Sequence, residues 1–260
     1  MDNIENYKKI AIEAREKVLE LIYKAQTSHI GSNFSCLDLL TVLFEKANIK
    51  KDKLIVSKGW VAASIYTFLA YKGIIPKSDL KKYCRPGSKY IGLIEPLGIF
   101  GCEFAGGSMQ LGDGASLGFA LAKKLKQEDG KIYVLESDGG VDGGIFWESV
   151  LLANQFKLNN LVWIIDANGF QAMGKKNEIV DIEPLKNKFK NFGWYVKEIN
   201  GHDFYEIERA LNYKHSGPYV IIARTEKGFP VSFMRGNNFY HYANLTTKMY
   251  KTALKELNAQ

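Results

Sequence analysis

Two polar side chains in the middle of the chain have the types and the setting of a metal site. Asp138 lies in a glycine-rich stretch, Ser137-Asp138-Gly139-Gly140, directly after a short apolar run, and Asn168 closely follows a second apolar run. A carboxylate and an amide oxygen are hard ligands that suit Mg²⁺, and two such ligands leave positions open for phosphate oxygens. Glycines beside the carboxylate let backbone N–H groups approach those phosphates. The pattern favours a cradle for Mg²⁺ and a diphosphate; the alternatives are a plain nucleotide-binding turn or a turn without ligand.

The elements around these residues predict how the two side chains come together. Apolar runs at 132–135 and 161–165 flank an amphipathic segment at 145–156. A strand, a glycine turn, a helix and a second strand form a βαβ unit, in which the strands are parallel and the crossover is right-handed. Asp138 and Asn168 then leave the carboxyl ends of neighbouring strands, which is where ligands bind in open α/β sheets.

The rest of the pattern predicts one α/β domain over residues 1–260, with an open, mainly parallel sheet flanked by helices. Further helices are expected at 4–25, 37–44, 61–72, 116–126, 183–191, 204–211 and 245–257, and further strands at 54–57, 194–199 and 219–224. Ser35 is expected to cap the helix over 37–44, and His29 to lie in a loop before it. Residues 76–107 and 227–244 are expected to be long loops, the second of which carries His241.

Composition argues against several classes of protein. The formal net charge is +7, but the lysines are spread along the chain without the aromatic interleaving of an RNA-binding module. We interpret the charge as solvated surface that favours anionic substrates, with no nucleic-acid partner. No apolar run approaches the ~20 residues that span a bilayer, and the N-terminus lacks the apolar core of a signal peptide. The three cysteines, Cys36, Cys84 and Cys102, form no C-x-x-C pair, which favours a reducing, cytoplasmic setting and argues against zinc.

A series of short motifs extends over nearly the whole chain. They are Ser28-His29-Ile30-Gly31-Ser32, Ser57-Lys58-Gly59-Trp60, Gly107-Ser108-Met109, Ser137-Asp138-Gly139, Phe146-Trp147-Glu148, Asn200-Gly201-His202-Asp203, Thr225-Glu226-Lys227-Gly228 and Tyr240-His241. In type and order they resemble the motifs of the N-terminal domain of transketolase. The stretch from Asp138 to Asn168 resembles the thiamin diphosphate motif. The resemblance implies the thiamin diphosphate-binding fold of that family, with thiamin diphosphate and Mg²⁺ (or Ca²⁺ or Mn²⁺) as cofactors.

The resemblance also implies roles for the matched residues. The metal ligands would be Asp138, Asn168 and the backbone carbonyl of Phe170. The other residues against the cofactor would be Gly107, Met109, Ser137, Gly139 and Trp60. His29 and His241 would be catalytic, standing beside the reacting carbonyl, where they polarise it or move protons.

Some positions depart from the family pattern. Trp60 stands where the family has a histidine that reaches the diphosphate, and an indole donates one hydrogen bond but never carries charge. Leu93 stands where the family has a histidine that contacts sugar hydroxyls. Gly143-Gly144 lacks a carboxylate that the family associates with subunit coupling. The metal ligands are retained while parts of the sugar channel are not, so we expect cofactor binding with an altered substrate.

The resemblance implies a split enzyme. Nothing in these 260 residues resembles the pyrimidine-binding domain that follows on the same chain in family transketolases. The expected function is therefore that of the N-terminal subunit of a two-subunit transketolase, which transfers a two-carbon ketol unit between sugars or sugar phosphates. Its expected partner is a separate C-terminal, pyrimidine-domain subunit, in a homodimer of heterodimers. Two alternatives stay open: a thiamin-dependent subunit that decarboxylates 2-oxoacids or forms acyloins, and a non-catalytic binding subunit.

Overall fold

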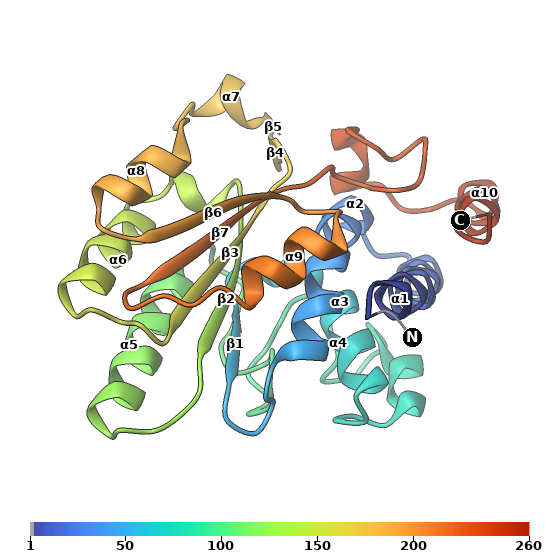
Figure 1. Cartoon of the computed structure of the whole chain (residues 1–260). Helices are drawn as coiled ribbons and strands as arrows, with labels where there is room; N and C mark the ends of the chain where they lie inside the picture. Colours follow the sequence, from blue (N-terminus) through green and yellow to red (C-terminus); the bar gives the residue numbers. More distant parts are fainter. Residues whose placement is uncertain (1–2, 260) are drawn as a thin grey trace.

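A five-stranded parallel sheet forms the centre of the structure, a computed structural model that describes residues 3–259 (Figure 1). Its strands are β1 (Lys53–Val56), β2 (Ile132–Ser137), β3 (Leu161–Ala167), β6 (Tyr195–Asn200) and β7 (Tyr219–Arg224), in the order β1-β2-β3-β7-β6. All seven residues of β3 are buried, because helices cover both faces of the sheet and leave no polar face to the strand. The predicted α/β fold with an open parallel sheet is confirmed.

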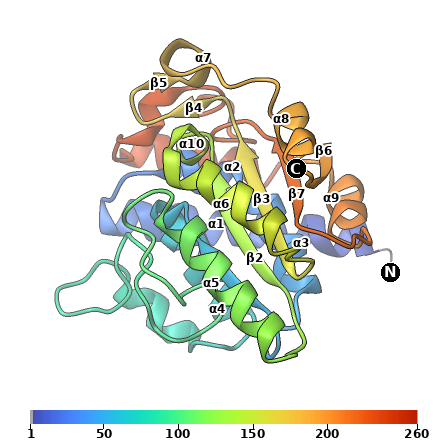
Figure 2. The same ribbon diagram turned by 90° about the vertical axis from the view of Figure 1, so that its left-hand side faces the viewer.

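Helices lie on both sides of the sheet (Figures 1 and 2). One side carries α5 (Leu111–Leu125), α6 (Gly144–Gln155) and α8 (Leu185–Asn191), and the other carries α3 (Leu37–Lys46), α4 (Ala62–Tyr71) and α9 (Phe204–Leu211). One cluster of buried apolar side chains lies between the sheet and the first helix layer, and a second cluster lies between the sheet and the other layer. The three-layer arrangement positions the strand ends and leaves them accessible along one edge.

The longest helix, α1 (Asn3–Ala25), packs outside α3 and α4, beside α10 (Thr247–Leu257). It is amphipathic: Tyr7, Ile10, Val18 and Ile22 are buried, at the three-to-four spacing that the sequence predicts. Across residues 3–259, no helix combines the length and the apolar character needed to cross a membrane.

Short elements surround the carboxyl edge of the sheet. They are α2 (Ile30–Ser35), the 3₁₀ turns η1 (Gly59–Val61), η3 (Gly140–Asp142) and η4 (Asn238–His241), the hairpin β4 (Phe170–Gln171) and β5 (Gly174–Lys175), and α7 (Lys176–Ile179). A further 3₁₀ segment, η2 (Lys77–Lys82), contacts α4. At this edge, β2 and β3 pair in parallel with Ser137 opposite Asp166, so Asp138 and Asn168 leave adjacent strands as predicted.

Two local predictions are wrong. The helix expected from residue 116 begins at Leu111. Its first turn contains Gly112, which has a low intrinsic helix propensity but packs closely on Ser57: a Cβ added to Gly112 would lie 2.9 Å from the Ser57 Cβ. His29, by contrast, lies in the loop directly before α2, as predicted, with φ of 71°, whereas Gly31 lies inside that helix. Ser35 does not cap α3: it lies in α2 and donates its hydroxyl to Asp166 Oδ2 at 2.6 Å.

Candidate functional site

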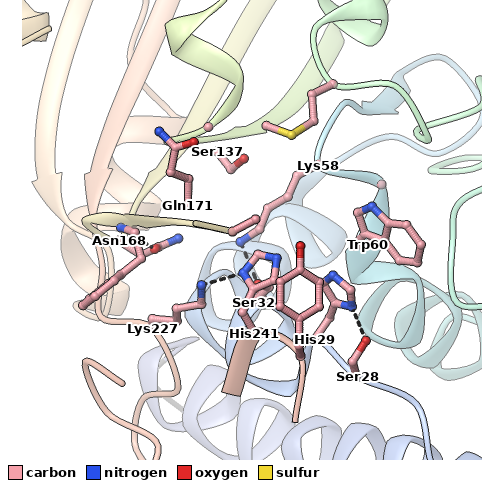
Figure 3. A pocket seen from close by; sticks show the side chains of 16 residues that line it. Ser28, His29, Ser32, Lys58, Trp60, Ser137, Asn168, Gln171, Lys227 and His241 are labelled. Atoms are coloured by element: carbon pink, nitrogen blue, oxygen red, sulfur yellow. Dashed lines mark hydrogen bonds between the residues drawn. The ribbon is translucent and has the colours of Figure 1, made fainter. Parts of the chain in front are cut away.

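A cavity of about 420 Å³ opens at the carboxyl edge of the sheet (Figure 3). Of the residues that the sequence predicts for the site, those that line the cavity are His29, Trp60, Met109, Ser137, Gly139, Asn168, Phe170 and His241. These residues come from segments spread over the length of the chain, so the fold has gathered them. Gly107 and Asp138 do not line the cavity, and each has a distinct position.

Asp138 is buried behind the residues that line the cavity, against the turn that follows β3. The backbone N–H of Gly169 donates to Asp138 Oδ2 at 2.6 Å, and the N–H of Phe170 donates to Asn168 Oδ1 at 3.1 Å. Gly169 has φ of 82°, a conformation that favours glycine. Burial raises the pKa of Asp138 to about 6, although the Lys176 ammonium, 3.5 Å from Oδ1, lowers it. The carboxylate, the amide oxygen and the Phe170 backbone therefore belong to one compact arrangement.

This oxygen set fits a hard divalent cation. Within residues 3–259, no three His, Cys, Asp or Glu side chains come together in a metal-binding group. A metal at Asp138 would therefore rely on one carboxylate together with the neutral oxygens of Asn168 and Phe170. Oxygen-only sets of this kind suit Mg²⁺, Ca²⁺ or Mn²⁺, and a short protein set leaves positions for phosphate oxygens.

A buried carboxylate, Asp166, orients the Asn168 amide. Asp166 is fully buried at the end of β3, and it accepts hydrogen bonds from Lys58, Ser35, Thr225 and Asn168. Burial alone would raise the pKa of Asp166, but the Lys58 ammonium holds it below its usual value. Because Asn168 Nδ2 donates to Asp166 at 3.2 Å, the amide oxygen is turned toward the Phe170 side of the turn.

The wall opposite the turn is formed by two histidines and a lysine. The rings of His29 and His241 lie 4.8 Å apart, and Lys227 Nζ lies 2.7 Å from His241 Nδ1. Burial and the Lys227 charge lower the pKa of His29 to about 4 and that of His241 to about 3, so both imidazoles are neutral near pH 7. With Lys227 as donor, we assign the proton of His241 to Nε2, which faces away from the lysine.

The mouth of the cavity is apolar. The Trp60 ring stacks on His29 with centroids 4.6 Å apart and an interplanar angle of 8°, and 44% of Trp60 is exposed. The end of the Met109 side chain packs closely on Gly139: a Cβ added to Gly139 would lie 2.6 Å from Met109 Cε. Gly107 lies outside the cavity, where its added Cβ would meet Leu93 Cδ2 at 3.0 Å.

Lys58 and Lys227 are site residues that the sequence predictions missed. Lys227 is 1% exposed and donates to Asn238 Oδ1 at 2.8 Å, and burial, with the Lys58 charge, lowers its pKa to about 7. Lys58 bonds Asp166 and the Ser32 carbonyl. Both lysines stand inside matched motifs, and each directly precedes a glycine. That placement is a usable signal, since a buried lysine almost always has a specific partner.

Comparison with known proteins agrees with this geometry. Residues 7–258 match the family described as "Transketolase, thiamine diphosphate binding domain". An apulose-4-phosphate transketolase subunit of Phocaeicola vulgatus is 33% identical over 258 residues, which cover 94% of this chain and 91% of that protein. The 6-deoxy-6-sulfo-D-fructose transketolase subunit SqwG of a Clostridium species is 32% identical, over 95% of this chain and 94% of that protein. The crystal structure of transketolase from Campylobacter jejuni matches with a TM-score of 0.93 and 30% identity.

The chain therefore belongs to the transketolase family, as a thiamin diphosphate-binding domain of that family. This confirms the family that the motifs predict. The match covers 99% of this chain but only 43% of the Campylobacter jejuni transketolase chain. The chain thus spans less than half of a solved transketolase and nearly all of the two relatives that are named as subunits.

Proposed function

We propose that this chain is the cofactor-binding subunit of a two-subunit transketolase, which transfers a two-carbon ketol unit between sugars or sugar phosphates. The observation that carries the proposal is the cavity itself. It brings the Asn168–Phe170 turn, tied to Asp138, against the wall of His29, His241 and Lys227. The length of the match to two relatives named as transketolase subunits supports the two-subunit form.

In this proposal, the residues of the β2 and β3 ends hold the cofactor. Thiamin diphosphate held there would supply a nucleophilic carbon and an electron sink for chemistry at a carbonyl. Asp138, Asn168 and the Phe170 carbonyl would hold Mg²⁺. Ser137, Gly139 and Trp60 would lie against the diphosphate, and Met109 would lie beside the rings. Gly107, which lies outside the cavity, could adjoin the rings only where they extend beyond it.

The two histidines would act on the reacting carbonyl. Both imidazoles are neutral near pH 7 because burial and Lys227 lower the pKa of each, so each ring can donate one hydrogen bond and accept another. His241, with its proton on Nε2, would polarise the carbonyl oxygen, and His29 would move a proton at the same group. Ser28 Oγ, 2.6 Å from His29 Nδ1, fixes the orientation of the His29 ring.

The proposed partner is a separate C-terminal, pyrimidine-domain subunit, in a homodimer of heterodimers. Exposed apolar side chains at the mouth of the cavity support a covering partner: Trp60 is 44% exposed, Met109 40% and Tyr242 63%. The three cysteines are free, in keeping with a reducing, cytoplasmic location.

A labelled donor tests the reaction. The chain is mixed with the candidate partner, thiamin diphosphate and Mg²⁺, and given a ketose phosphate labelled with ¹³C at carbons 1 and 2 together with an aldose phosphate. The proposal predicts a new ketose phosphate, two carbons longer than the aldose acceptor and labelled at carbons 1 and 2, together with an unlabelled aldose phosphate two carbons shorter than the donor. Cofactor binding by the mixed subunits without any transfer, from a panel of ketose donors, would instead indicate a non-catalytic binding subunit.

A second candidate is favoured by the apolar character of the mouth. Leu93 packs beside Gly107, and Trp60 stacks on His29. Neither Leu93 nor Trp60 can carry a positive charge or donate two hydrogen bonds, as a protonated histidine could. A donor with a methyl group in place of a hydroxymethyl group would suit such a surface, as in 2-oxoacid decarboxylation or acyloin formation. Release of CO₂ from pyruvate by the mixed subunits, without transfer from a ketose, would support this candidate over the first.

A further inference from the structure

We infer that Lys176 is a resident cation of the Asp138 site: it balances the carboxylate when no metal is bound, and a divalent metal binds by displacing it. The inference rests on the proposed function, because it takes Asp138 as the charged metal ligand. It concerns a residue outside the motifs that carry the family resemblance.

The backbone places Lys176 beside the turn that carries the proposed metal ligands. Its N–H donates to the Gly169 carbonyl at 2.9 Å, and the Gly169 N–H in turn bonds Asp138 Oδ2 at 2.6 Å. Lys176 Nζ faces the other carboxylate oxygen, Oδ1, at 3.5 Å. With Oδ2 committed to the backbone, Oδ1 is the oxygen that a metal would use, and it is the one that the lysine faces.

The Lys176 side chain is buried, and its ammonium group has few polar partners. Lys176 is 6% exposed and Asp138 2% exposed. Apart from its ion pair with Asp138, the Lys176 ammonium has no hydrogen-bond partner in the part of the chain that the structure describes. A buried ammonium without hydrogen bonds is costly, so its position is explained by the carboxylate that it neutralises.

The surroundings also give the ammonium a place to move. Lys176 lines a second cavity, of about 150 Å³, together with Asp138, Asp181 and the ion pair that Glu183 forms with Arg224. Burial raises the pKa of Asp142, the nearby Lys176 charge opposes that rise, and Asp142 Oδ1 is buried without a partner among residues 3–259. When a divalent ion binds at Oδ1, repulsion between the two cations in a buried site is strong, and the ammonium can pair with Asp142 or Asp181 instead.

Direct metal binding tests the inference. Mn²⁺ is titrated into the full chain and followed by electron paramagnetic resonance, with and without thiamin diphosphate. Lys176→Met keeps the length of the side chain and removes its charge, so we expect it to bind Mn²⁺ at least tenfold more tightly than the wild type. Lys176→Arg, which keeps the charge, should behave like the wild type. Lys175→Met is the matched control, since Lys175 is exposed and pairs with Glu178 at 3.4 Å.

A second readout uses stability without metal. Lys176→Met leaves Asp138 without its counter-charge, so the metal-free variant should melt below the wild type, and saturating Mn²⁺ should remove most of the difference. If Lys176→Met does not fold, Lys176→Gln serves for both measurements.

The outcomes separate this inference from the proposed function. Equal or weaker Mn²⁺ binding by the uncharged Lys176 variants would overturn the resident-cation role and leave the metal site standing. If Mn²⁺ binds neither the wild type nor the variants, with or without thiamin diphosphate, the metal site and the role of Lys176 are both wrong.

Discussion

The backbone N–H of Gly169 donates a hydrogen bond to Oδ2 of Asp138 at 2.6 Å. This bond joins the loop after β2 to the turn after β3, and it holds the carboxylate beside the turn that carries Asn168. A prearranged set of ligand oxygens lowers the cost of binding a metal, because little has to be ordered at that moment.

Removing the carboxylate should abolish tight cofactor binding. In the Asp138→Ala variant the proposed metal keeps only neutral ligands, so we expect calorimetry with thiamin diphosphate and Mg²⁺ to show a loss of affinity beyond the ~10- to 100-fold typical of changes around a metal site. Asp129→Asn is the control, since Asp129 is exposed and pairs with Lys51 on the surface, away from the proposed ligand set. Unchanged affinity in Asp138→Ala would rule out the metal assignment.

Lys58 should be essential to the stability of the site. Lys58→Met leaves Asp166 buried without its counter-charge, and breaking a buried pair in this way costs about 3–5 kcal/mol. Urea unfolding measures the loss. Lys51→Met serves as the control, because Lys51 pairs with Asp129 on the surface, and its midpoint should match the wild type. Equal midpoints for both variants would show that the Asp166 network does not stabilise the fold.

Gly59 should not tolerate a methyl group. A Cβ there would lie 2.1 Å from the Gly106 carbonyl oxygen, which is a backbone atom that cannot rotate away. We expect Gly59→Ala to lower the free energy of unfolding by about 1–3 kcal/mol or more. Gly118→Ala, at a position in α5 with nothing within 4 Å, should be neutral or stabilising. The opposite ranking of the two variants would mean that the close approach of Gly59 and Gly106 is not real.

His29 should make the fold sensitive to acid. Burial and the Lys227 charge lower its pKa from 6.5 to about 4, so between these values the unfolded chain binds more protons than the folded protein. Stability from this group is present above pH 6.5 and is lost as pH falls toward 4, by on the order of 3 kcal/mol in full. Unfolding free energies at pH 7.5 and 4.5 should differ less in His29→Gln than in the wild type. Equal differences in the two proteins would contradict the lowered pKa.

The sequence predicted the parts of the fold with strong local patterns. The runs at 132–135 and 161–165 are apolar on both faces, and the structure buries both in neighbouring parallel strands. The placement of Asp138 and Asn168 followed from them. In contrast, α2, the β4–β5 hairpin and α7 span only a few residues each, too few for a periodic signal, and contacts with distant segments fix them.

The same limit explains which site residues were missed. Histidine and aspartate are residue types that often bind metals or transfer protons, so they could be predicted as site residues from the sequence. Lys58 and Lys176 have buried ion pairs that form only in the folded chain. Ser35 has the residue type of a helix cap, but it bonds Asp166, which is 131 positions further along the chain. No local pattern reports a partner at that distance.

The requirement for a second subunit is the central claim, and one assay tests it most directly. In the proposed assembly, the carboxylate that activates the cofactor's aminopyrimidine comes from the partner. The purified chain is assayed for transfer from a ketose donor, with thiamin diphosphate and Mg²⁺, first alone and then mixed with the pyrimidine-domain product of a neighbouring gene. We expect turnover only in the mixture, and turnover by the chain alone at the rate of the mixture would contradict the requirement for a second subunit.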